Sequence, residues 1–233
     1  MGLQPKATEA YVVDALERWK HERDVLTLFK DFWFPLEDRI HLQLAKLLGA
    51  ASTQELCLVS SLTVNLHSVL ATFYRPLETR RDKIIMLAPE FNSDVFAVEG
   101  WLELYQRKDA LIRVPVEDTA LANDLIVKEV ERSKDVAGVL CMSAVSYVTG
   151  QFYDIKRIAE CCRKNNVHLV LQLAHAMGAV ELQLHDWGVD CAVWCSYKYM
   201  NCLMGAIGGI FIHERHFDKM PGLRGWFGTD KQV

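Results

Sequence analysis

The sequence predicts an α/β domain built on a mostly parallel sheet with helices on both faces. Short, almost continuously apolar segments alternate with segments whose apolar residues recur at helical spacing. Strands that are apolar on both faces are typical of a parallel sheet covered on both sides. The 233 residues are 51% hydrophobic and 24% charged, which favours a globular chain with a large core. We expect a helical N-terminal segment over residues 1–50 and the sheet domain over residues 51–233.

The first fifty residues are expected to be helical. An amphipathic pattern covers residues 7–30, and an aromatic-rich connection, FKDFWFPLEDRI, leads into a second helix. Pro35 is expected in the first turn of that helix, where a backbone N–H has no partner in any case. Gly49 is expected just after its end, because glycine readily adopts the left-handed conformation that ends many helices.

From residue 51 onwards, predicted strands and helices alternate. The predicted strands are ELCLVSS, KIIMLAP, ALIRVPV, AGVLCMSA, HLVLQLAH, CAVWCSYKY and GGIFIHE. The predicted helices are LTVNLHSVLATFY, SDVFAVEGWLELYQ, TALANDLIVKEVERS and IKRIAECCRKNN. Pro115 indicates an edge strand, since proline cannot donate to a neighbouring strand. Ser93 or Asp94 is expected to cap one helix, and Asp118 or Thr119 to begin another.

Charge, hydropathy and cysteine content exclude several classes of partner. A net charge of −4 gives no basic surface for nucleic acid or for an anionic membrane. No apolar run reaches the ~18 residues that a membrane span requires, and the N-terminus lacks the basic-then-apolar pattern of a signal peptide. The seven cysteines show no paired C-x-x-C spacing, so we interpret them as thiols in a reducing compartment. These observations predict a cytoplasmic protein.

Side chains at the carboxyl ends of the strands are the first candidates for a site, because open α/β sheets bind ligands there. Ser60 and Ser61 end the predicted strand ELCLVSS, and Thr63 follows in the first turn of the next predicted helix. The free N–H groups and the dipole of a helix N-terminus attract phosphate. Thr63 could contribute a hydroxyl to such a site, or it could simply cap the helix.

Lys198 follows an apolar strand in CSYKYMN. A desolvated lysine loses its proton readily, which favours Schiff-base chemistry, although a lysine here could also extend its stem and keep its ammonium group in water. His175 lies just after another strand and could contact a ligand or be a hydrogen-bonded structural histidine. Gln172 is a lone amide in the apolar strand HLVLQLAH, and the strand alone does not indicate what it faces.

The order of these features resembles that of the fold-type I enzymes that use pyridoxal 5'-phosphate (PLP). More narrowly, the chain resembles the kynureninases, particularly the animal enzymes, in LTVNLH, YVTGQFYDI, LAHAMGAVELQLHDWGVDCAVWCSYKYMN, GIFIHERH and GWFG. The resemblance covers nearly the whole chain. It implies the PLP-dependent transferase-like large domain, PLP as cofactor and a homodimer. It also implies hydrolysis of L-kynurenine or 3-hydroxykynurenine to alanine and an anthranilate, in tryptophan catabolism towards NAD. Cysteine desulfurases and other class-V aminotransferases share the fold but not the HDWGVD and SYKY motifs.

The resemblance also assigns roles to individual residues. Lys198 matches the lysine that forms a Schiff base with the cofactor. The other matched cofactor contacts are Leu62, Thr63, Phe91, Asn92, Ser93, Asp94, Ser143, Gln172, His175, Tyr197 and Trp226. Within this set, Leu62 and Thr63 match the phosphate-binding turn, and Phe91 matches a ring that stacks on the cofactor. Asp94 matches an aspartate near the pyridine side, and Trp226 would reach in from a second subunit.

Gln172 departs from the family, in which an aspartate stands at this position in a run resembling FDLAHA. That carboxylate keeps a proton on the pyridine nitrogen, so that the ring can accept electrons. A neutral glutamine cannot hold the proton by charge. Loss of ~3 kcal/mol of carbanion stabilisation would slow that step about a hundredfold. We therefore expect a weakened electron sink, which Asp94 could partly restore if it lies close to the same nitrogen.

Other departures leave two functions open. The chain begins inside a segment that resembles GNSLGLQPK in the family and ends shortly after Trp226, before the family's small C-terminal domain. Cys202, Leu203 and Met204 are bulkier than the small residues that follow the lysine in the family. One hypothesis is a PLP-dependent kynureninase-like hydrolase. The alternative is a catalytically impaired paralogue or fragment that binds PLP or pairs with a full-length kynureninase.

Overall fold

The computed structural model describes residues 2–223 and confirms the α/β prediction. Its sheet has seven strands in the order β1-β7-β6-β5-β4-β2-β3. The strands are β1 (Leu56–Leu58), β2 (Lys83–Ala88), β3 (Leu111–Pro115), β4 (Ala137–Ser143), β5 (His168–Gln172), β6 (Cys191–Trp194) and β7 (Gly209–Ile212). Five of them, from β3 to β6, are mutually parallel, and β7 runs antiparallel to both β6 and β1.

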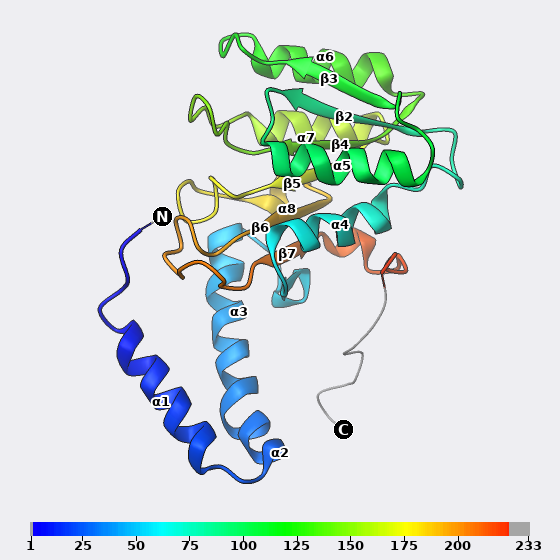
Figure 1. The fold of residues 1–233 in the computed structure, drawn as a ribbon. Coiled ribbons are helices and arrows are strands. Elements are labelled where there is room, and N and C mark those ends of the chain that lie inside the picture. Colours follow the sequence, from blue (N-terminus) through cyan, green and yellow to red (C-terminus); the bar gives the residue numbers. More distant parts are fainter. Residues whose placement is uncertain (1, 224–233) are drawn as a thin grey trace.

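Helices cover both faces of the sheet (Figure 1). The α-helices among residues 2–223 are α1 (Thr8–His21), α2 (Val25–Leu28), α3 (Phe34–Leu48), α4 (Leu62–Phe73), α5 (Asn92–Leu104), α6 (Ala122–Ser133), α7 (Ile155–Lys164) and α8 (Leu184–Trp187). Residues of α4 and α5 form one apolar core with one face of the sheet, and residues of α3, α6, α7 and α8 form another core with the opposite face. None of the helices among residues 2–223 is long and apolar enough to cross a membrane.

Alternate residues of the central strands supply the two cores. Ile84 and Met86 of β2 belong to the core under α4 and α5, whereas Ile85 and Leu87 belong to the other core, and all four are buried. Side chains of a strand alternate between its faces. A strand that is buried on both sides therefore reads as a continuous apolar run, which is why the sequence indicated a parallel sheet.

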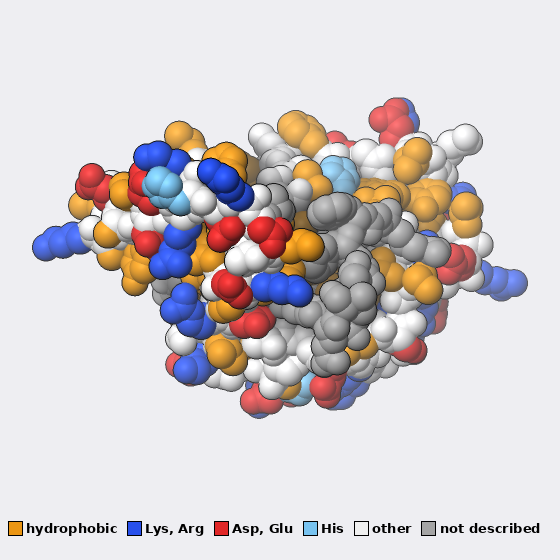
Figure 2. Space-filling model, turned by 90° about the horizontal axis from the view of Figure 1, so that it is seen from below, with side chains coloured by type: hydrophobic (Ala, Val, Ile, Leu, Met, Phe, Trp, Pro, Cys, Tyr) orange, Lys and Arg blue, Asp and Glu red, His pale blue; other side chains and the backbone are white. Residues whose placement is uncertain are grey.

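The N-terminal segment is helical, as predicted, but it is divided differently. The single helix expected over residues 7–30 is two helices, because α1 ends at His21 and α2 begins at Val25. A π-helix, Phe29–Trp33, then joins α2 to α3. In Figure 1, α1 stands apart from the sheet, and only the C-terminal end of α3 reaches it, where Leu44 and Leu48 enter the core. Figure 2 views the molecule from below, where exposed hydrophobic side chains lie among charged ones.

The expected ends of the elements are partly confirmed. Pro35 lies in the first turn of α3, and Gly49 ends that helix with a φ of 61°. Pro115 ends β3, which lies at the edge of the sheet as predicted. The predicted caps of α5 and α6 are wrong. Phe91 and Leu121 occupy the N-cap positions and make no side-chain cap bond, and the predicted cap Asp118 instead accepts a hydrogen bond from Ala120 N.

Candidate active site

The carboxyl ends of β2, β4, β5 and β6 meet along one edge of the sheet, and most of the predicted site residues follow these ends. A pocket of about 90 Å³ opens there. It is lined by Ser61, Leu62, Thr63, Phe91, Ser93, Asp94, Gln172, Ala174, Tyr197 and Lys198. Eight of the predicted residues therefore share one pocket, although they lie far apart in the sequence. His175 joins them through Lys198, whereas Trp226 lies outside the described residues.

Lys198 points into this site. Its Nζ lies 3.3 Å from His175 Nε2 and 5.6 Å from the centre of the Phe91 ring, and the residue is half-buried. Burial and the positive charge of Lys198 both lower the pKa of His175. A neutral imidazole can accept a hydrogen bond from the ammonium group. Of the two interpretations of Lys198, the structure therefore supports the lysine of a site.

Gln172 faces Asp94. Its Nε2 donates to Asp94 Oδ2 over 2.7 Å, and its Oε1 accepts from Ala174 N over 2.8 Å. Both side chains are buried, with 2% of Asp94 and 4% of Gln172 exposed. Asp94 Oδ1 is also buried and has no hydrogen-bond partner among residues 2–223. Oδ2 of Asp94 is therefore held by a hydrogen bond, and Oδ1 is free to accept one.

Burial raises the pKa of Asp94 to about 6, and the nearby Glu90 carboxylate acts in the same direction. The hydrogen bond from Gln172 and the charge of Lys198 act in the opposite direction on this pKa but do not outweigh burial. A carboxyl group with a strongly displaced pKa, next to a lysine in a pocket, is typical of functional sites.

Glu90 supports the site from outside the pocket, and no sequence motif predicted this role. It is 5% exposed, and its carboxylate accepts hydrogen bonds from Ser143 N, Ser143 Oγ and Phe91 N over 2.8, 2.6 and 2.9 Å. Glu90 thereby ties the end of β4 to the loop that carries Phe91. Ser143 points to Glu90 and does not line the pocket, so its predicted cofactor contact stays a prediction, as does that of the exposed Asn92. The available signal was a lone carboxylate directly after the apolar strand KIIMLAP.

The N-termini of α4 and α5 contribute hydroxyl groups to the pocket. Ser61, not Thr63, caps α4, because its Oγ accepts from Val64 N over 3.4 Å. Thr63 Oγ1 instead lies 3.3 Å from Ser93 Oγ, in the first turn of α5. The capping alternative for Thr63 is therefore wrong. Two helix N-termini and their hydroxyls converge here, an arrangement that favours the binding of an anion.

The bulky residues after Lys198 do not narrow the pocket. Cys202, Leu203 and Met204 are all exposed, with 77% of Leu203 and 69% of Met204 accessible to solvent. None of the three lines the pocket. The extra bulk of these side chains relative to the family therefore faces solvent and not the pocket.

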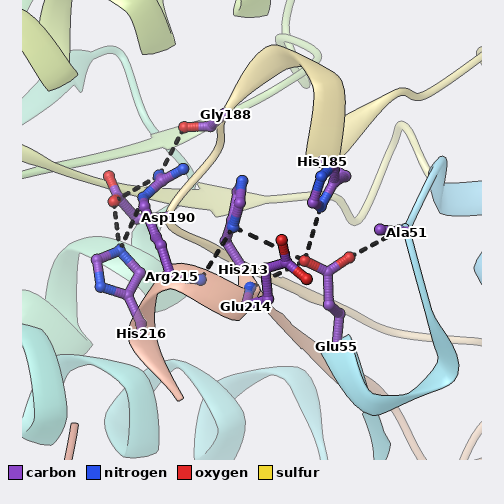
Figure 3. A network of polar contacts seen from close by, with 9 residues as sticks. All are labelled: Ala51, Glu55, His185, Gly188, Asp190, His213, Glu214, Arg215 and His216. Atoms are coloured by element: carbon purple, nitrogen blue, oxygen red, sulfur yellow. Dashed lines mark hydrogen bonds and ion pairs between the residues drawn. The ribbon is translucent and has the colours of Figure 1, made fainter. Parts of the chain in front are cut away.

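Two buried carboxylates outside the pocket fix the segment around the HDWGVD motif (Figure 3). Glu55 accepts hydrogen bonds from Ala51 N and Glu214 N and pairs with His185 Nδ1 over 2.9 Å. Asp190 pairs with Arg215 over 2.7 Å and with His216 over 2.6 Å. Because protein donors already satisfy these carboxylate oxygens, we interpret both networks as structural supports of the β6 and β7 ends.

Residues 23–229 match the model of the family described as "Aminotransferase class-V". The chain belongs to the class-V aminotransferase family. It is 36% identical to Kynureninase 1 of Neurospora crassa over 251 residues, which cover 100% of this chain and 52% of that protein. Identity to the Homo sapiens kynureninase is 36%, covering 99% of this chain and 50% of the relative. The Flavobacterium johnsoniae kynureninase is 35% identical, with coverage of 100% and 56%. The chain therefore spans about half the length of the curated relatives it matches.

Solved structures show the same fold. The apo cysteine desulfurase of Thermococcus onnurineus NA1 superposes with a TM-score of 0.74 at 21% identity, covering 97% of this chain and 55% of that one. The cystine C-S lyase C-DES, in complex with its product cysteine persulfide, gives 0.76 at 15% identity, with coverage of 91% and 55%. The predicted PLP-dependent transferase-like fold is thereby confirmed.

Proposed function

We propose that this chain is the large domain of a kynureninase-like, PLP-dependent hydrolase. One observation carries the proposal: a half-buried lysine lies at the carboxyl edge of the sheet, beside His175, the Phe91 ring and a pocket that contains the buried Asp94. The kynureninase relatives, which match this chain over nearly its whole length, support PLP as the cofactor and kynurenine as the class of substrate.

The residues of the pocket fit PLP by their chemistry. The Lys198 amine would bond covalently to the cofactor, and the N-termini of α4 and α5 with Thr63 and Ser93 would hold its phosphate. Phe91 would stack on its ring, and Tyr197 would lie beside the phosphate. The unpartnered Asp94 Oδ1 would accept a hydrogen bond from the ring side. When bound, PLP supplies the electron sink for cleavage of the β,γ carbon–carbon bond of kynurenine, which yields alanine and an anthranilate.

The chain's own residues would manage the proton at Lys198. His175 Nε2 lies 3.3 Å from Lys198 Nζ, within reach for proton transfer. The lowered pKa of His175, caused by burial and then by the lysine charge, favours the neutral imidazole that can take up a proton. His175 Nδ1 is buried without a hydrogen-bond partner, so residues 2–223 provide no carboxylate at that nitrogen to stabilise the charged ring.

Gln172 favours a second candidate function, that of a PLP-binding paralogue with impaired turnover. The resemblance implies an aspartate at this position, and the neutral amide here contributes no charge to the ring nitrogen. Such a protein could pair with a full-length kynureninase rather than act alone.

We further propose a cytoplasmic homodimer with an N-terminal helical segment at residues 1–50 and a PLP-binding domain at residues 51–233. All seven cysteines are free thiols, which supports a reducing compartment. Tyr11, Leu16 and Trp19 of α1 are exposed, which supports a partner surface on this helix. Sedimentation over a range of concentrations would test the dimer.

The test of function is anthranilate release from L-kynurenine, followed by its fluorescence after the chain is mixed with PLP. Release that requires Lys198, judged with Lys198→Ala, would establish the hydrolase. Gln172→Asp should raise the rate by up to about a hundredfold. Release by Gln172→Asp but not by the natural chain would favour the impaired paralogue. If neither the natural chain nor Gln172→Asp released anthranilate, the hydrolase proposal would be refuted and only a binding role would remain.

A further inference from the structure

We infer that this chain carries a second binding site, for a small phosphate-bearing ligand, at the amino ends of the parallel strands. A cavity of about 460 Å³ opens there. Arg81, which precedes β2, and His168, the first residue of β5, both line it. The pocket at Lys198 lies at the opposite, carboxyl ends of these strands. The two sites are therefore separate, and the second one does not depend on the binding of PLP.

The cavity concentrates positive charge in a chain whose net charge is −4. Its charged lining consists of four basic side chains, Arg75, Arg80, Arg81 and Lys219, and two acidic ones, Glu78 and Asp135. An excess of positive charge at a concave surface attracts anions. Segments far apart in the sequence supply these residues, so the folded chain and not a local motif creates the charged cavity.

Neutral groups hold the guanidinium of Arg81 in place. Its Nη1 donates to the carbonyl oxygens of Asn165, over 2.9 Å, and of Asn166, and the residue is partly buried. Among residues 2–223, Arg81 forms no ion pair, so its charge is not neutralised. Removing a charge from water is costly without a counter-charge. An anion in the cavity would supply that counter-charge to a guanidinium that is already positioned.

The other basic side chains are also weakly compensated. Nη1 of Arg75 lies 3.8 Å from Glu78 Oε1, and the Glu78 side chain is 69% exposed, so water and salt screen this pair. Within the described part of the chain, the exposed side chains of Arg80 and Lys219 make no hydrogen bond or ion pair. Asp135 forms no ion pair there either. The two acidic residues therefore leave most of the positive charge available to a ligand.

Phosphate is the chemical group that fits this set of side chains. The forked N–H donors of a guanidinium match the oxygens of a phosphate, and several cations around one cavity favour a group with more than one negative charge. The volume of about 460 Å³ lies within the range of small-molecule sites, roughly 300–1,000 Å³. This volume leaves room for an organic group beside the phosphate.

Isothermal titration calorimetry with inorganic pyrophosphate tests the site in the full chain. Arg80→Gln is the informative variant, because the exposed Arg80 side chain makes no bond within residues 2–223. Arg39→Gln changes an exposed arginine of α3 that does not line the cavity and is the matched control. Arg80→Gln should weaken pyrophosphate binding at least about tenfold, the loss expected for one charge-assisted hydrogen bond. Arg39→Gln should weaken it by less than about twofold.

Two further variants make the test specific to this cavity. Lys219→Gln, in a distant segment of the chain, should weaken pyrophosphate binding at least about threefold. Thr63→Val removes a hydroxyl from the pocket at Lys198, which could also attract an anion, and should retain the binding event that Arg80→Gln weakens. Circular dichroism checks that each variant is folded.

Four results would overturn the inference. The first is a natural chain that does not bind pyrophosphate, and the second is an equal loss in Arg39→Gln and Arg80→Gln, which would indicate only the overall charge. The third is binding that Thr63→Val abolishes and Arg80→Gln leaves intact, because the probe would then lie in the pocket at Lys198. Malonate, a dicarboxylate with fewer oxygens and less charge, should bind at least about tenfold more weakly than pyrophosphate. Equal or tighter binding of malonate is the fourth, because it would refute phosphate as the recognised group.

Discussion

Replacing Asp94 by asparagine should make the cofactor-free chain more stable, and increasingly so as the pH rises. Asp94 is 2% exposed, and burial raises its pKa from an ordinary value of 3.8 to about 6 in the folded chain. A carboxyl whose pKa is raised on folding contributes its stability below the unfolded value, and that stability is lost as the pH rises through the folded value. One pKa unit corresponds to about 1.4 kcal/mol, so ionised Asp94 should cost about 3 kcal/mol at pH 8.

Asparagine keeps the shape and can still accept the Gln172 bond, but it carries no charge. The free energy of unfolding of Asp94→Asn should therefore exceed that of the natural chain by about 3 kcal/mol at pH 8 and by less than about 1 kcal/mol at pH 4. Urea titration of both proteins at the two pH values measures this difference. Glu99→Gln, which neutralises an exposed carboxylate on the same helix, should change stability by less than about 0.5 kcal/mol at either pH. A natural chain more stable than Asp94→Asn at pH 8 would show that the buried Asp94 carboxylate does not destabilise the fold.

Two further substitutions test the supports of the fold. Burial alone would raise the pKa of Asp190, but its bonds from histidines and Arg215 hold that pKa well below its usual range. The carboxylate therefore stabilises the fold near neutral pH, and this stabilisation is lost as the pH falls. Asp190→Asn should lower the unfolding free energy by about 3 kcal/mol at pH 7, and a loss below about 1 kcal/mol in urea titration would contradict the network. Gly49→Ala places a side chain at a φ of 61° against the backbone of Gln183. The substitution should therefore lower the unfolding free energy by at least about 2 kcal/mol. An unchanged melting temperature would contradict the left-handed conformation of residue 49 at the end of α3.

The sequence was most informative where a structural feature depends on local pattern. The strand-end positions of Gln172 and Lys198 follow from continuous apolar runs, and these runs are set by burial on both faces of the sheet. The ends of α3 were predictable because Pro35 and Gly49 act through their own backbone geometry. The resemblance to kynureninases then grouped residues from several strand ends, and eight of the predicted residues line one pocket.

What escaped the sequence depends on contacts between distant segments. Asp94 was expected as a possible helix cap, but its carboxylate bonds to Gln172, 78 residues away in the chain. Glu90 carries no motif, and its role appears only where β4 brings Ser143 beside it. The size of Leu203 likewise says nothing about the pocket, because its side chain faces solvent. Local patterns do not report such long-range pairings.

A PLP site at Lys198 is tested by the visible absorption spectrum of the purified chain mixed with PLP, recorded beside that of Lys198→Ala. We expect a visible band, absent from free PLP, that forms with the natural chain and is lost in Lys198→Ala, because the amine at the pocket is the group that bonds to the cofactor. Identical spectra for the two proteins would contradict a PLP site at this edge of the sheet.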